Sequence, residues 1–414
     1  MSESTDLRFD FGLEHAYFDA HHAGDTAAEI AQQPAIWVAL ADQLLAQRSD
    51  LAAFMERIGD LTARRIIFTG AGSSAFIGDA LAPLLAADSG IPAESIPTTE
   101  IVSAPRSLLF SDVPTLLVSF ARSGNSPESV GAVEYVRRMV DDLFEVAITC
   151  DGTAQLATIT AESDRSLVMV MPEGSNDKGF AMTSSVSCML LAGYSLFNLS
   201  KLDIFAGVIR QLAEDVTVSS RALSDAAQRL AKRDFDRIVY LGSGFLKHIA
   251  HEAELKMMEL TNGIVNGSFE SATGFRHGPK SIIKDKTMTV HLISPDPFTA
   301  RYDLDLLDEV CEQKKGNLIV ALGDEVTIGR CADETATGLC ADEIIGTGVA
   351  GGATGSRADT APGGDLCAGL VMLVFAQMLA LFKSIDLGIT TDNPSPSGEV
   401  NRVVQGVTVY PLLS

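Results

Sequence analysis

Short runs of apolar and β-branched residues alternate with longer amphipathic segments along most of the chain. Such runs are typical of buried parallel strands, and the amphipathic segments are typical of the helices that connect them. The pattern therefore predicts β-α-β units in the first half of the chain. The predicted strands are Thr115 to Ser119, Glu145 to Thr149 and Leu167 to Met171, and the predicted helices are Ser126 to Val140 and Thr183 to Asn198.

The second half repeats this order. The string RIIFTGAGSS, from Arg65 to Ser74, recurs as RIVYLGSGFL, from Arg237 to Leu246. Each copy has a strand-like run, a G-x-G turn and the start of a helix, so we expect two α/β domains with mostly parallel sheets flanked by helices, a three-layer αβα, flavodoxin-like arrangement. The second-half strands are predicted at Thr287 to Ile293, Asn317 to Ala321 and Glu343 to Gly346, with a helix from Gly364 to Ser384.

The length of 414 residues allows two domains of ordinary size with terminal extensions. The tail contains the irregular segment Thr390 to Gly398, rich in Pro and Gly, followed by a β-like run from Val403 to Tyr410. The predicted boundaries are a helical extension over 1–50, a first domain over 51–205, a linker helix over 206–234, a second domain over 235–388 and a tail over 389–414.

Composition and charge narrow the class of protein. Hydrophobic residues make up 46% of the chain and charged residues 21%, which is a globular composition. The formal net charge of −23 opposes binding to nucleic acid or anionic membranes. The six cysteines form no C-x-x-C pair and no secretory signal is visible, so we expect a cytoplasmic protein. The apolar stretch Ala368 to Phe382 contains Gln377 and is short for a membrane span, which favours a buried helix.

Two serine-bearing loops follow predicted strands. The turn Gly70 to Ser74 opens a helix, and Ala121 to Glu128 follows the next strand, with Ser126 as a candidate N-cap. Ligands of open parallel sheets bind at the carboxyl ends of the strands, where helix N-termini attract anions. We therefore expect these loops, with the cluster that begins at Thr183, to bind one phosphate. The candidate ligands are Ser73, Ser74, Arg122, Ser123, Ser126 and Thr183.

Two alternatives remain open for the first loop. Its sequence also fits the G-x-G-x-x-A pattern of a dinucleotide site, with Asp88 near the spacing of a ribose-binding acid. A purely structural turn is the other alternative. The pair Ser73 and Ser74 favours phosphate, since a dinucleotide loop needs no such pair of hydroxyls.

The candidate catalytic helix runs from His248 to Glu259. Glu252, Lys256 and Glu259 recur at i, i+4 and i+7 and therefore share one face, with Glu254 roughly opposite. Ion pairing on the protein surface would explain this spacing equally well.

A glycine-flanked loop from Gly274 to Lys280 favours catalysis, because it presents the neighbouring pair Arg276 and His277. His248 and His251 lack the H-E-x-x-H arrangement, so no metal and no other cofactor is expected.

Three further strings make the chain resemble a known family. FAMTSS (Phe180 to Ser185), GFRHGPKS (Gly274 to Ser281) and DNPSPSGEVNRVVQGV (Asp392 to Val407) resemble the tagatose-6-phosphate ketose/aldose isomerases, which are also described as galactosamine-6-phosphate deaminase/isomerases. This family has two sugar isomerase (SIS) domains in tandem, like the isomerase half of glucosamine-6-phosphate synthase. The resemblance covers nearly everything after Leu51.

The resemblance implies roles for the candidates. It matches the four loop serines to phosphate-binding positions, Glu259 to the carboxylate that moves the proton, and His277 to the ring-opening histidine, with Glu252 and Lys256 as supporting groups. Lys256 or Arg276 could stabilise a developing oxyanion. Gln405 stands where the synthase has an imine-forming lysine, which argues against a Schiff-base route. The synthase histidine comes from a neighbouring subunit, so a homodimer or homotetramer with a shared site is expected.

The predicted reaction converts an amino-hexose 6-phosphate, galactosamine 6-phosphate first, to tagatose 6-phosphate and ammonia through an enolamine. Ketose/aldose isomerisation without deamination, and deamination of glucosamine 6-phosphate, are the alternative reactions. A sugar-phosphate-sensing regulator is a third possibility, against which stand the lack of a basic DNA-binding segment and the charge of −23.

Overall fold

The computed structural model describes residues 7–324, 328, 341–348, 364–404 and 406–412. It divides into two compact units. The first unit, as we name it, is formed by Ile36–Asp177, Ser184–Ala206 and Ser397–Ser414. The second unit is formed by Met1–Ala35, Lys178–Thr183 and Gly207–Pro396. The domain boundaries given above stay a prediction.

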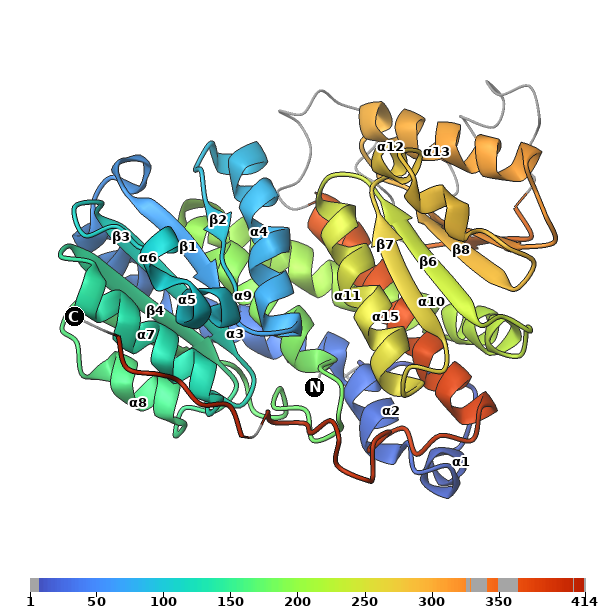
Figure 1. Cartoon of the computed structure of the whole chain (residues 1–414), viewed down its shortest axis with the longest axis horizontal. Coiled ribbons are helices and arrows are strands. Elements are labelled where there is room, and N and C mark those ends of the chain that lie inside the picture. Colours follow the sequence, from blue (N-terminus) through green and yellow to red (C-terminus); the bar gives the residue numbers. More distant parts are fainter. Residues whose placement is uncertain (1–6, 325–327, 329–340, 349–363, 405, 413–414) are drawn as a thin grey trace, which may run out of the picture. The chain divides into compact units, whose positions relative to one another are not determined.

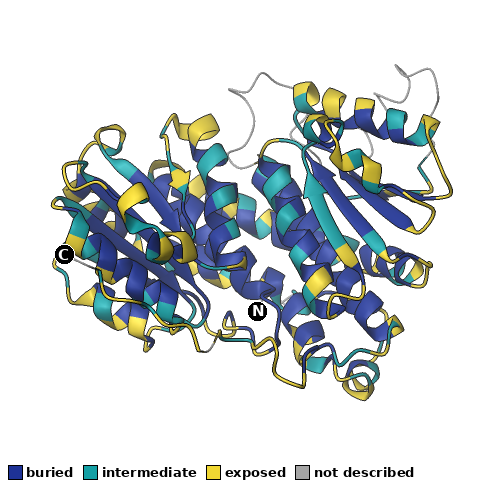
Figure 2. Cartoon of the chain, in the orientation of Figure 1, coloured by how far each residue is buried: buried dark blue, intermediate teal, exposed yellow. Residues whose placement is uncertain are grey.

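The first unit contains a five-stranded parallel sheet in the order β2-β1-β3-β4-β5 (Figure 1). Its strands are β1 (Arg65–Thr69), β2 (Glu94–Ser95), β3 (Thr115–Ala121), β4 (Leu143–Thr149) and β5 (Ser166–Val170). All seven residues of the central strand β3 are buried, as the continuous apolar run predicts (Figure 2). Its principal helices are α3 (Gln33–Ile58), α4 (Ser73–Ser89), α5 (Thr98–Ser103), α6 (Pro105–Leu108), α7 (Pro127–Met139), α8 (Gln155–Ala161) and α9 (Ser184–Phe197).

The second unit repeats this topology with the order β7-β6-β8-β9-β10, also all parallel. Its strands are β6 (Arg237–Gly242), β7 (Asn266–Glu270), β8 (Thr287–Leu292), β9 (Leu318–Gly323) and β10 (Glu343–Gly346). Its helices include α1 (His15–Ala20), α2 (Gly24–Ala31), α11 (Phe245–Leu260), α12 (Ala272–Phe275), α13 (Pro297–Glu312) and α15 (Gly364–Asp386), and α10 (Leu202–Ala231) leads into it. Two parallel α/β units flanked by helices confirm the predicted fold class.

The long apolar helix α15 is part of a core. It is long and apolar enough to cross a membrane, but 94% of its apolar window is buried inside the structure (Figure 2). It packs against α11 of the same unit. The expected buried helix is confirmed.

The structure corrects the prediction for the tail. The described residues of the run from Val403 to Tyr410 form no strand. Instead, the hydroxyl of Tyr135 on α7 donates to the backbone carbonyl of Tyr410, and Val409 and Leu412 pack against the apolar cluster beneath α7. Apolar residues in this tail therefore cover a helix rather than extend a sheet.

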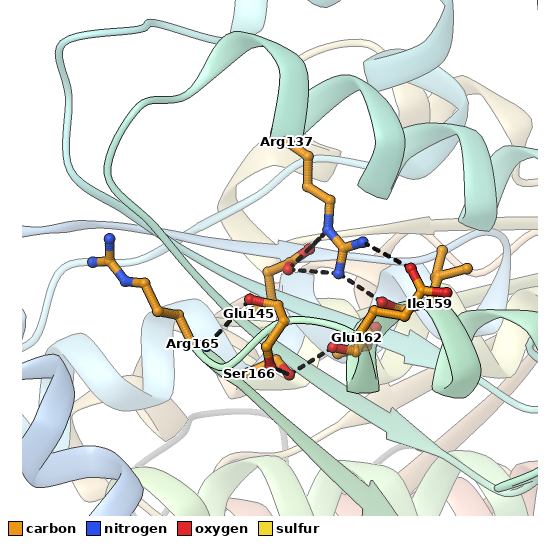
Figure 3. A network of polar contacts seen from close by, with 8 residues as sticks. Arg137, Glu145, Ile159, Glu162, Arg165 and Ser166 are labelled. Carbon is orange, nitrogen blue, oxygen red and sulfur yellow. Dashed lines mark hydrogen bonds and ion pairs between the residues drawn. The ribbon is translucent and has the colours of Figure 1, made fainter.

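A partly buried ion pair joins α7 to β4 in the first unit (Figure 3). The side chain of Glu145 is 4% exposed and accepts from Nε and Nη2 of Arg137 at 2.9–3.1 Å. Arg137 also donates to the carbonyl of Ile159 at 2.7 Å. Burial raises the pKa of Glu145 although Arg137 lowers it, so the ionised carboxylate depends on its partner.

Replacing Arg137 with alanine is expected to lower the free energy of unfolding by about 3 kcal/mol, because it leaves a buried carboxylate without its cation. Urea unfolding at neutral pH measures the loss. Arg138→Ala, at an exposed site on the same helix, should change stability by less than about 0.5 kcal/mol. Equal losses in the two variants would contradict a special role for the Arg137 pair.

Candidate active site

The loop after β1 places two serines at the start of α4. Gly72, the N-cap residue, has φ 56° and ψ −132°, a conformation that favours glycine. A Cβ at Gly70 would lie 2.5 Å from the backbone of Ser74, so the turn is too tight for a side chain there. Ser73 and Ser74 consequently occupy the first turn of α4 and are 4% and 5% exposed.

The loop after β3 lies next to this one, because β1 and β3 pair in parallel register. Ser126 caps α7 by accepting from the backbone N–H of Ser129 at 3.3 Å, and Ser123 accepts from the N–H of Asn125 at 3.4 Å. The four predicted serines thus come to one edge of the first sheet, at two helix N-termini. Hydroxyl groups at helix N-termini on such an edge suit an anionic ligand.

Arg122 connects this edge to the C-terminal tail. It is 7% exposed and its Nη2 donates to the carbonyl of Arg402 at 2.7 Å. Arg402 in turn donates to the carbonyl of Asp177 at 3.0 Å and to Oδ1 of Asn176 at 3.1 Å. Arg402 is not among the site residues predicted from the sequence, although it lies in one of the three strings that resemble the family. Gln405 lies outside the described residues.

The two serines at the start of α9 donate hydrogen bonds to a carboxylate of the chain. The fully buried carboxylate of Asp177 accepts from the N–H and hydroxyl groups of both Ser184 and Ser185. Thr183, the predicted phosphate ligand beside them, is fully buried and belongs to the second unit, where its carbonyl accepts from Gln377 at 3.5 Å. The role of Thr183 as a phosphate ligand stays a prediction.

The face of α11 that carries three charged residues forms a largely buried cluster. Nζ of Lys256 lies 3.2 Å from Oε1 of Glu252 and 2.6 Å from Oε2 of Glu259. The side chains of Lys256, Glu252 and Glu259 are 0%, 3% and 25% exposed. This burial argues against the alternative of a solvated surface ion pair. Glu259 is the member that a substrate can reach.

The charges of this cluster are coupled. Burial lowers the pKa of Lys256, but the carboxylates of Glu252 and Glu259 raise it more, so the ammonium stays charged. Glu254 lies elsewhere on the helix, against β7, where a Cβ on Gly267 would approach its side chain to 2.6 Å. Burial and the charge of Glu259 raise the pKa of Glu254.

Ion pairs anchor the loop that carries His277. Nη2 of Arg276 lies 2.9 Å from Asp305 and its Nε 2.5 Å from Glu309, both on α13, and Lys280 also pairs with Glu309. Gly278, with φ 121°, allows the turn that follows the exposed His277. Both carboxylate partners of Arg276 come from α13, so its contacts fix the loop in place.

Glu259 and His277 lie toward opposite ends of the second sheet. Helix α11 starts at the carboxyl end of β6 and runs back along the sheet, so its residue Glu259 is about 21 Å from its start at 1.5 Å per residue. His277 follows β7 and α12, on the side where the strands end. A single chain does not bring the predicted base and the predicted ring-opening histidine together.

Within the described ranges, no three His, Cys, Asp or Glu side chains are placed to hold a metal ion. His251, considered above as a ligand, stacks on Phe269 with ring centroids 3.9 Å apart.

A cavity of about 540 Å³ is lined by α1, α2 and the segment 390–393, and it contains none of the predicted site residues.

Known proteins resemble this chain along most of its length. A model of the SIS domain matches residues 61–199. A Streptomyces coelicolor protein provisionally described as D-galactosamine-6-phosphate deaminase AgaS is 41% identical over 94% of this chain and 95% of its own. The D-galactosamine-6-phosphate deaminase AgaS of Shewanella sp. is 39% identical over 94% and 92%. A solved structure from Clostridium novyi, provisionally described as a tagatose-6-phosphate ketose/aldose isomerase, has a TM-score of 0.88 at 37% identity and covers 97% of this chain and 99% of that one.

Proposed function

Because the chain belongs to the SIS-domain family of AgaS-type D-galactosamine-6-phosphate deaminases, we propose that it converts galactosamine 6-phosphate and water to tagatose 6-phosphate and ammonia. The observation that carries this proposal is the α11 cluster, in which one accessible carboxylate, Glu259, lies against a buried ammonium. A family of this kind acts on sugar phosphates, and the loops after β1 and β3 offer an anion site in the first unit.

The residues divide the work between binding and proton transfer. Ser73, Ser74, Ser123 and Ser126, with the backbone at two helix N-termini, bind the phosphate, and buried Arg122 adds positive charge beside them. His277 moves a proton between the ring oxygen and the anomeric hydroxyl, which opens the sugar ring. This binding uses no metal or organic cofactor.

Proton transfer along the carbon chain then releases the amine. Glu259 removes the proton from C2 of the open-chain aldehyde, which forms an enolamine, and returns a proton to C1, while a proton passes from the amine of the substrate to the C1 oxygen. The resulting ketimine at C2 adds water and expels ammonia, leaving the ketone of tagatose 6-phosphate. The ammonium of Lys256, 2.6 Å from Oε2 of Glu259, is fully buried and supports this carboxylate rather than contacting the substrate. The contacts of Arg276 support a positioning role for it, on the loop of His277.

Assay of the pure protein with galactosamine 6-phosphate tests the function. We expect stoichiometric ammonia and tagatose 6-phosphate without added metal. Interconversion of galactose 6-phosphate and tagatose 6-phosphate with no ammonia from the amino sugar would favour the second candidate, the isomerisation named for the Clostridium novyi relative. Faster ammonia release from glucosamine 6-phosphate than from galactosamine 6-phosphate would make the other C4 epimer the preferred substrate. No turnover of any of these would overturn the proposal.

We also infer that the enzyme is a cytoplasmic homodimer or homotetramer whose sites are shared between chains. The separation of Glu259 and His277 within one chain supports this, since a second chain can supply the histidine. Inactive Glu259→Gln and His277→Ala chains, mixed and reassociated, should regain about a quarter or more of the wild-type rate. A mixture as inactive as its parents would contradict a shared site.

Ser123→Ala is expected to raise KM for galactosamine 6-phosphate by about 10-fold and to leave kcat nearly unchanged, because a hydrogen bond to a charged group contributes about 1.5 kcal/mol or more. Steady-state kinetics measure both constants. Ser107→Ala, at an exposed serine of α6, is the control and should change neither. A fall in kcat alone would contradict a phosphate role for Ser123.

A further inference from the structure

The two units share their loop geometry as well as their strand order. Gly244, which precedes α11, has φ 58° and ψ −127°, almost the values of Gly72 before α4. A Cβ at Gly242 would meet Leu246 at 2.9 Å, as one at Gly70 would meet Ser74. The loop after β6 is therefore the structural counterpart of the loop after β1, where we place the phosphate.

The neighbouring loops correspond too. Helix α7 begins with the N-cap Ser126 followed by proline, and α13 begins with the N-cap Asp296 followed by proline. Each cap accepts from the N–H group three residues further on. Aligning the two caps puts Asp303 of α13 at the position of Val133 of α7.

The carboxylate of Asp303 joins the two loops of the second unit that correspond to these loops of the first. It is 3% exposed, and its Oδ1 accepts from the hydroxyl of Ser243 at 2.5 Å, in the loop after β6. Its Oδ2 accepts from the N–H of Ser294 at 3.1 Å, in the loop after β8. A carboxylate of the chain thus takes donors from the same two loops whose counterparts carry the phosphate serines in the first unit.

The first unit has no such group at this position. Val133 is 1% exposed and packs in an apolar cluster with Leu117 and Val136. Burial raises the pKa of Asp303 to about 6, against the lowering effect of its bonds from Ser243 and Ser294, so the group is mostly ionised at neutral pH. The second unit therefore has a buried negative charge at a position where the first unit has an apolar side chain.

We propose that the carboxylate of Asp303 substitutes for a phosphate in the second unit, so that each chain has one phosphate-ester site rather than two. The proposal rests on the phosphate site assigned above to the first unit. It explains how a duplicated chain can use its second copy for acid-base groups without binding a second sugar phosphate there.

Titration of the folded protein with inorganic phosphate at about pH 7.5 tests the proposal. Wild type should bind one phosphate per chain. Asp303→Val, which reproduces the first unit, should bind a second, and adding Ser243→Ala to that variant should remove the second site. An Asp303→Val protein that binds no more phosphate than wild type would overturn the proposal, as would a wild type that binds two.

The reciprocal variant Val133→Asp tests the proposal even if Asp303→Val does not fold. Val133→Asp should lose phosphate binding in the first unit while its far-ultraviolet circular dichroism stays that of wild type. Unchanged phosphate binding in a folded Val133→Asp protein also contradicts the proposal. The ammonia assay tests the proposed function independently of this proposal. If the protein released no ammonia, the number of phosphate ions bound per chain would still test the role of Asp303.

Discussion

Glu259→Gln is expected to lower kcat for galactosamine 6-phosphate by about 10²–10⁴-fold and to leave the affinity for the phosphate ester nearly unchanged. Glutamine has almost the shape of glutamate, but its amide cannot accept a proton from C2. The proposed phosphate ligands lie on the loops after β1 and β3 in the first unit, whereas Glu259 belongs to α11 of the second unit, so the substitution leaves those loops unchanged. Loss of the chemical step with retained binding is the signature of a base.

Two measurements make this result specific. Turnover is followed by ammonia release, and binding is followed by calorimetric titration with galactitol 6-phosphate, an open-chain analogue. Glu134→Gln, at an exposed glutamate of α7, is the matched control and should keep the wild-type rate. If Glu259→Gln retains more than about a tenth of wild-type kcat, another group must take the proton.

The sequence pattern predicts the parts of this molecule whose signals are local. The central strands are continuous apolar runs, and the i, i+4, i+7 spacing on α11 correctly put Glu252, Lys256 and Glu259 on one face. The same pattern could not decide whether that face is buried. Helix α11 packs against α15, which lies far away in sequence, so the burial of this helix has no local signal.

Other features have no local signal. Strand β7 has the sequence NGSFE, with one aromatic residue and no apolar run, because it is an edge strand whose residues are half-buried or exposed. The contact of Arg402 with Asp177 joins residues 225 positions apart. In the sequence, nothing distinguishes Asp303 from the other acidic residues of α13. Its role depends on hydrogen bonds from Ser243 and Ser294, which lie in the loops after β6 and β8.

Lys256→Met is expected to lower the free energy of unfolding by about 3–5 kcal/mol, because it leaves the buried Glu252 and the partly buried Glu259 side by side without a cation. Methionine keeps most of the volume of the lysine chain, so a packing defect contributes little. Urea unfolding measures the loss, and Lys232→Met, at an exposed site, should cost less than about 0.5 kcal/mol.

The pH dependence identifies the cause of that loss. In the wild type the pKa of Lys256 is raised, so its stabilising contribution is complete below the ordinary lysine pKa of 10.5 and is lost only at higher pH. In Lys256→Met, acidification protonates the stranded carboxylates, so the deficit should narrow as the pH falls. Adding Glu252→Gln removes one buried charge and should recover part of the lost stability at neutral pH. A deficit that is independent of pH and unchanged by Glu252→Gln would mean that Lys256 acts through packing rather than through charge.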